Sequence, residues 1–142
     1  MSGLSDDFIK GVDISSYISE TNSGVVYHDW DGNNLDQDGF FKLLKDSGVN
    51  YVRIRVWNDP YNSSGMGYGG GNNDLAKAVT MGQLATKAGL RVLIDLHYSD
   101  FWADPGKQKA PKAWAQLTFD EKKTAIQEYT ANSLTTLLQA GV

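Results

Sequence analysis

The segment of residues 47–57 reads SGVNYVRIRVW and contains the pattern that decides the fold. From residue 51 its side chains alternate strictly between two faces, as they do along a β-strand. One face carries Val52, Ile54 and Val56, and the other carries Tyr51, Arg53, Arg55 and Trp57. We therefore expect a strand with its apolar face buried against helices and its two arginines turned toward a polar environment.

Helical patterns lie on both sides of this strand. Residues 36–46 carry apolar side chains at helical spacing before it, and a second helix is expected to start at Asp74. Each helical pattern ends in a turn that contains a glycine, Gly48 in the first and Gly89 in the second. Glycine adopts the left-handed conformation that ends many helices, so both turns are expected to lead directly into a strand.

The same order of strand, loop, helix and glycine turn occurs three times. Residues 8–14 are the first strand candidate, and residues 90–96 form the third strand after Gly89. The third helix is expected to begin at Thr118, because Thr118 and Glu121 have the spacing of a capping box. Repeated units of this kind are typical of right-handed βα crossovers and a parallel sheet.

The loops distinguish between two kinds of parallel α/β fold. Each loop after a strand is long and rich in aromatic and polar residues, as at the active-site face of a (β/α)8 barrel. An open doubly wound sheet also binds ligands at this edge, but Arg53 and Arg55 on one strand face favour the barrel. We expect the first three βα units of a (β/α)8 TIM barrel in residues 8–142, preceded by an N-terminal tail of residues 1–7.

Composition excludes several other classes of protein. The chain has 142 residues, of which 41% are hydrophobic, and a formal net charge of -4, which argues against a nucleic-acid partner. It has no cysteine, and no apolar run is long enough for a membrane span. His28 and His97 are its only histidines, and no metal-binding motif is present, so neither a metal nor a cofactor is expected.

A glycine-rich motif between the second strand and the second helix resembles a dinucleotide-binding fingerprint. Gly65, Gly67 and Gly70 have the spacing G-x-G-x-x-G. Residues 58–64 separate the motif from the strand, and Asp74 is expected to occupy the helix N-terminus that would otherwise face a pyrophosphate. We therefore interpret the segment as a loop in which glycine lets the backbone approach another group closely.

Four segments then identify a family by resemblance. YVRIRVWNDPY, YGGGNNDLAKA, LIDLHYSDFWADPGKQ and PKAW occur in the order found in glycoside hydrolase family 53, the endo-β-1,4-galactanases. The resemblance extends over residues 8–142. It implies a (β/α)8 barrel and retaining hydrolysis of β-1,4-galactan in the arabinogalactan side chains of pectin, without a cofactor, by a secreted enzyme.

The resemblance also implies where the reaction takes place. Family members use two glutamates, an acid/base and a nucleophile, at the ends of the fourth and seventh strands. Neither strand is in this sequence, so no catalytic residue is expected in the chain, and residues 1–142 alone are expected to be inactive. Because Gly141 and Val142 introduce no further strand, we expect the chain to be the N-terminal part of a longer protein.

Five residues at the strand ends are candidates for substrate binding or active-site support. They are Arg55, Asp59, His97, Asp100 and Trp102. Arg55 resembles the family arginine that supports the nucleophile carboxylate. The alternative is a structural ion pair with Asp13 or Asp95, which is the interpretation we favour for Arg53.

The other four candidates also have two interpretations each. His97 is placed to hydrogen-bond the acid/base or a sugar hydroxyl, or it is a satisfied core residue. Trp102 suits stacking on galactose, or it belongs to the core. Asp100 either orients His97 or binds sugar hydroxyls, while Asp59 belongs to an Asn-Asp-Pro turn that competes with a site role.

Two alternative functions stay open. Three βα units leave sheet edges unpaired, so the chain could act as a non-catalytic partial barrel that binds sugar or self-associates. Another clan A endo-glycosidase, acting on mannan or xylan, is the second alternative. The expected partner is β-1,4-galactan or a galacto-oligosaccharide, with no nucleic acid and no membrane, and the isolated chain is expected to self-associate or to need the rest of the barrel.

Overall fold

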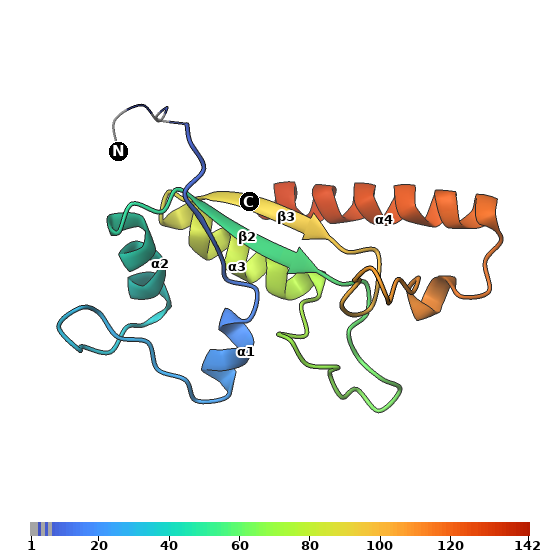
Figure 1. Ribbon diagram of the computed structural model, residues 1–142, viewed down its shortest axis with the longest axis horizontal. Coiled ribbons are helices and arrows are strands. Elements are labelled where there is room, and N and C mark those ends of the chain that lie inside the picture. The colour runs from blue at the N-terminus through green and yellow to red at the C-terminus, as the bar shows by residue number, and fades with distance from the viewer. Residues whose placement is uncertain (1–2, 4, 6) are drawn as a thin grey trace.

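The computed structural model describes residue 3, residue 5 and residues 7–142, and it contains a parallel sheet (Figure 1). The strands are β1 (Gly11–Asp13), β2 (Tyr51–Val56) and β3 (Arg91–Leu96), in the order β1-β2-β3. Both neighbouring pairs are parallel. The predicted sheet is therefore confirmed, although the first strand is shorter than predicted, because only Gly11–Asp13 pair with β2. Phe8 and Ile9, which precede it, are about half exposed. The predicted tail of residues 1–7 lies largely outside the described residues.

The three predicted helices are present, and two short helical segments were not predicted. The predicted helices are α2 (Gln37–Asp46), α3 (Leu75–Lys87) and α4 (Phe119–Gln139); the others are α1 (Tyr17–Asn22) and the 3-10 turn η1 (Lys112–Trp114). Side chains of Asp36, Asp74 and Thr118 cap the three long helices. Each cap accepts a backbone N–H that the first helical turn leaves unpaired, and Thr118 forms the predicted capping box with Glu121.

One face of the sheet is covered by α3, and this contact contains most of the core (Figure 1). Val52, Ile54 and Val56 have no exposed surface, as the alternation of the sequence predicts. They belong to one core cluster with Ala78, Met81 and Ala85 of α3. Small residues on α3 let this helix lie close to the strands, while α2 and α4 pack on its two sides.

The glycine turns connect these helices to the strands as predicted. Gly48 and Gly89 have φ values of 88° and 76°, which L-residues with a side chain rarely adopt. After each glycine the chain bonds back to the helix, from Val49 N to Leu44 O and from Leu90 N to Ala85 O. The turns therefore fix where both strands begin.

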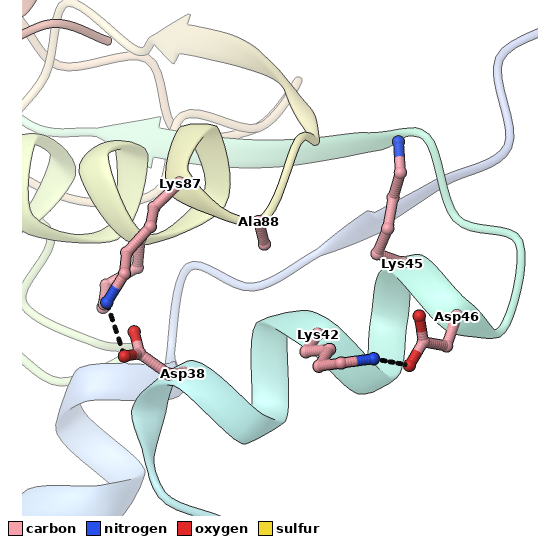
Figure 2. Close-up of a pocket in the computed structure, with 7 residues that line it drawn as sticks. Asp38, Lys42, Lys45, Asp46, Lys87 and Ala88 are labelled. Atoms are coloured by element: carbon pink, nitrogen blue, oxygen red, sulfur yellow. Dashed lines mark hydrogen bonds and ion pairs between the residues drawn. The ribbon is translucent and has the colours of Figure 1, made fainter.

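A shallow hollow of about 380 Å³ lies between α2 and α3, away from the strand ends (Figure 2). Its charged groups are paired: Lys42 with Asp46, and Lys87 with Asp38. Lys45 donates to the carbonyl oxygen of Gly89 at 2.6 Å. The Lys87–Asp38 pair joins the two helices at the surface, the Lys45 bond joins α2 to the turn after α3, and the Lys42–Asp46 pair lies within α2. Each lysine of this hollow therefore has a partner.

Candidate functional site

The carboxyl ends of the three strands lie at one edge of the sheet, where the long loops begin. The loops of residues 57–73 and 97–112 leave β2 and β3 at this edge. All five candidate residues lie here. Arg55, His97 and Trp102 form one contiguous group, whereas Asp59 and Asp100 lie in a second group with Lys112.

A row of charges crosses the face of the sheet that α3 does not cover. Arg53 donates to both Asp13 on β1 and Asp95 on β3. Burial lowers the pKa of Arg53, but the bond to Asp13 and the negative charge of Asp95 raise it more. The structural interpretation of Arg53 and Asp13 is confirmed.

Arg55 lies further along the same strand and has a different environment. Its side chain is only 8% exposed, and its guanidinium lies 4.1 Å from the centroid of the Trp102 ring. Burial lowers the pKa of Arg55, an effect that the charge of Asp13 only partly offsets. The Nε atom is 3.7 Å from an oxygen of Asp13 and has no hydrogen-bond partner among the described residues. The guanidinium is therefore held by stacking on Trp102 and by the nearby charge of Asp13, and its Nε atom is itself buried.

His97 is hydrogen-bonded through both ring nitrogens. Trp57 donates its indole N–H to Nδ1 of His97 at 2.9 Å, so Nδ1 carries no proton. Nε2 lies 3.1 Å from a carboxylate oxygen of Asp95, and this oxygen accepts a hydrogen bond from the N–H of Nε2. The contacts thus hold a neutral imidazole in one tautomer. The suggestion that Asp100 orients His97 is wrong, because Asp95 does so.

Trp102 forms an exposed wall of this group. Its side chain packs at a steep angle on the fully buried Trp57, with ring centroids 5.5 Å apart, and Trp102 is 41% exposed. The glycine-rich loop passes directly over both rings: a Cβ atom on Gly70 would lie 3.0 Å from Trp57 and 3.1 Å from Trp102. The prediction that glycine permits a close backbone approach is confirmed, and the groups approached are these two indoles.

Asp100 and Asp59 join the two loops to each other. Asp100 accepts the backbone N–H of Asp59 at 3.0 Å and that of Lys112 at 2.7 Å. The ammonium of Lys112 lies 2.7 Å from the Asp59 carboxylate and also donates to two backbone carbonyls. Burial lowers the pKa of Lys112, but Asp59 and Asp100 raise it more. Lys112, which the sequence reasoning missed, is the residue that organises this group.

An open cavity of about 450 Å³ adjoins Arg55 at the ends of β1 and β2. Ser16, Ser19 and Glu20 line it from α1, and Gly70 lines it from the glycine-rich loop. Sequence reasoning missed these polar residues because α1 has only six residues and shows no extended apolar period. The cavity gives a polyhydroxylated ligand room beside Arg55 and supplies several hydrogen-bonding groups.

The described residues contain no cluster of three or more histidine or carboxylate groups that could hold a metal ion. In the same part of the chain, no helix is long and apolar enough to cross a membrane. What the described residues do offer at the strand ends is a set of hydrogen-bonding groups, a stacked arginine and an exposed indole.

A parallel sheet with long polar and aromatic loops at its strand ends defines three βα units of a (β/α)8 barrel. Residues 9–142 match the profile of Glycosyl hydrolase family 53, and the chain belongs to this family. It is 55% identical over 140 residues to an endo-β-1,4-galactanase of Bacillus subtilis, covering 99% of this chain and 32% of that protein.

Two further comparisons agree with this assignment. An arabinogalactan endo-β-1,4-galactanase A of Emericella nidulans is 36% identical over 134 residues, covering 94% of this chain and 35% of that protein. The solved catalytic domain of an Ignisphaera aggregans family 53 protein superposes with a TM-score of 0.93 at 44% identity, covering 99% of this chain and 38% of that one. The chain spans about a third of the length of the curated relatives it matches.

Proposed function

We propose that the chain is part of a retaining glycoside hydrolase that cleaves β-1,4-galactan in arabinogalactan side chains. The observation that carries this proposal is the 55% identity over 140 residues to the Bacillus subtilis endo-β-1,4-galactanase. A second relative, from Emericella nidulans, is named for arabinogalactan. The proposed partner is therefore a galactan chain or a galacto-oligosaccharide, and the proposed location is outside the cell.

In this proposal the described residues bind and orient the sugar. Arg55 is proposed to support a nucleophile carboxylate, whose pKa the positive charge of its guanidinium would lower. Trp102 offers a partly exposed indole face for stacking on galactose. Both nitrogens of His97 already have partners, so its proposed role is to present a neutral, fixed imidazole edge beside the sugar.

The two catalytic carboxylates are proposed to come from outside residues 1–142. The glutamates of the chain are Glu20, Glu121 and Glu128. Glu20 lies in α1 and accepts from Tyr27, Glu121 belongs to the capping box of α4, and Glu128 lies within α4. None of them ends a strand, where a barrel enzyme places its catalytic groups.

The test measures reducing ends released from β-1,4-galactan by the folded 142-residue chain. We expect no release, whereas the Bacillus subtilis relative serves as the active control. Mixing the chain with the part of that relative that follows its matched region is expected to restore release, and an Arg55→Ala chain is expected to restore much less. Release by the chain alone would contradict the placement of the carboxylates, and restored activity on β-1,4-mannan or xylan instead would favour the other clan A specificities.

A second candidate function, self-association, has one specific observation in its favour. A hollow of about 400 Å³ runs between the outer edge of β3 and α4, and its lining is mostly apolar. Leu134 and Leu138 lie at this hollow and are 49% and 72% exposed. Exposed leucines beside an unpaired strand edge favour association with a second chain or with the missing strands. Light scattering after size exclusion would contradict self-association if it gave the mass of a monomer at all concentrations.

A further inference from the structure

A second cavity lies beside the candidate site, between the loops that follow β2 and β3. Its volume is about 590 Å³. Aromatic side chains and ammonium groups share its lining, which includes Tyr68, Phe101, Trp102, Lys107, Lys109 and Lys112. Nothing in the hydrolysis of a neutral galactan requires lysines at this position.

The three lysines differ in how their charges are balanced. Lys112 lies 2.7 Å from Asp59 and 3.7 Å from Asp100, so its charge is compensated. Lys107 and Lys109 have no carboxylate within 4.0 Å among the residues that the structure describes. The ammonium of Lys107 lies 5.7 Å from the centroid of the Phe101 ring, a weak contact that leaves its hydrogen-bond donors unused.

These two ammonium groups stand out against the charge of the whole chain. The chain carries a net charge of -4, yet the lining of this cavity holds three lysines and one carboxylate, that of Asp100. The single charge of Lys112 faces both Asp59 and Asp100, so the three lysines outnumber these two carboxylates by one. Asp104, which is near in sequence, is not part of the lining. The lining is therefore cationic and complementary to an anion.

The aromatic walls specify what kind of anion would fit. Tyr68, which is 42% exposed, lines the cavity together with Phe101, and such rings stack on the apolar face of a pyranose. We propose that the cavity binds an acidic sugar, a uronic acid unit whose ring stacks on the aromatic walls and whose carboxylate pairs with Lys107 and Lys109. The carbohydrate class of the ligand rests on the proposed function; the negative charge rests on the two lysines.

The position of this cavity connects it to the candidate site. A smaller cavity of about 220 Å³ is lined by His97 and shares Ser99, Lys109 and Ala110 with the cationic cavity. The two cavities are therefore neighbours. A sugar chain bound at His97 would place one of its units, or a branch, against Lys109, so that acidic units are recognised next to the neutral ones.

The test uses titration calorimetry with α-1,4-linked trigalacturonic acid as the probe. We expect binding that weakens as salt is raised, and that falls on the order of tenfold or more in a Lys107→Gln, Lys109→Gln double variant. The matched control is Lys122→Gln, Lys123→Gln, which removes the same charge from α4 and is expected to bind as the parent does. Circular dichroism shows that each variant is folded.

Two further ligands separate the sources of affinity. The carboxyl-reduced, neutral trisaccharide is expected to bind at least about tenfold more weakly, and inorganic phosphate is expected to bind more weakly than the acidic trisaccharide. Any one of three results would overturn the inference. The neutral trisaccharide could bind as tightly as the acidic one, the lysine double variant could bind as tightly as the parent, or phosphate could bind as tightly as the acidic trisaccharide. Galactan hydrolysis is measured separately in the complementation assay, so loss of that activity and loss of acidic-sugar binding are distinct results.

Discussion

The two faces of the same three strands are stabilised in different ways. On the face covered by α3, Val52, Ile54 and Val56 are fully buried and belong to the apolar core cluster. On the opposite face, Arg53 links two carboxylates, and Leu93, its register partner on β3, is 42% exposed. One face is held by packing, and the other by a row of charges that water still reaches.

This difference shows which residues can take part in function at little cost in folding stability. Burial of apolar area supplies most of the folding free energy, so the covered face tolerates few changes of volume or polarity. Charges in contact with solvent contribute less to stability, which leaves the residues of the other face available for orienting His97 and Arg55.

The largest effect on stability is expected when a side chain on the face covered by α3 is shortened. Ile54→Ala removes fully buried volume and should lower the free energy of unfolding by about 2–5 kcal/mol. The matched variant Leu93→Ala makes a similar change on the other face and should cost less than about 1 kcal/mol. Urea unfolding followed by circular dichroism measures both.

An equal loss of unfolding free energy in Ile54→Ala and Leu93→Ala would contradict the difference between the two faces of the sheet. It would mean that Leu93 is also buried in solution, by a second chain or by further strands. Repeating the Leu93→Ala measurement at several protein concentrations separates burial by a second chain from the other cases.

A smaller effect is expected from the row of charges. Asp95→Asn removes the negative charge of one of the two carboxylates that pair with Arg53, and it leaves an amide that can accept a hydrogen bond from His97 Nε2 or donate one to it. Because these groups are partly exposed, we expect a loss of about 1–2 kcal/mol. Nitrogen NMR of the His97 ring should show the Nε2–H tautomer in the parent and a changed proportion of the two tautomers in the variant.

The control for this prediction is Asp120→Asn, which removes an exposed partner of Lys123. It should change stability by less than about 0.5 kcal/mol and leave the His97 spectrum unchanged. A parent spectrum with the proton on Nδ1 would contradict the contact between Trp57 and His97.

The smallest expected effect is a dependence of stability on acid. Burial raises the pKa of Asp13, but hydrogen bonds from Ser15 and the charge of Arg55 outweigh it, so the pKa is lowered from 3.8. The folded state therefore favours the carboxylate, and this stabilisation is present above the unfolded pKa and is lost as pH falls through the folded one. Asp13→Asn should lose less stability than the parent between about pH 5 and pH 3. Parallel curves for the two proteins would show that Asp13 does not contribute.

Much of the fold could be predicted because its determinants are local. The alternation in residues 51–57, the caps Asp36, Asp74 and Thr118, and the turn glycines each act within a few residues of their own position. By contrast, α1 is a single short helix whose only buried residue is Tyr17, and no periodic signal marks it.

The candidate site was less predictable because its contacts join distant segments. Lys112 meets Asp59 across 53 residues, and nothing in the sequence near either residue indicates this pair. The partner of His97 could have been found, because Asp95 lies in β3 only two residues earlier, and residues two apart in an extended chain point to the same side. The prediction instead chose Asp100 from the polar loop after β3 as the partner of His97. Asp100 accepts backbone N–H groups and so holds the two loops together.

The order of the strands in the sheet, β1-β2-β3, is also their order along the chain. β2 therefore finds the edge of β1 already made when it leaves the ribosome, and β3 finds the edge of β2. Assembly can proceed unit by unit during synthesis, with only the outer edges of β1 and of the newest strand exposed. In such a chain, the strand edges through which it could aggregate are few and are exposed only for a limited time during synthesis.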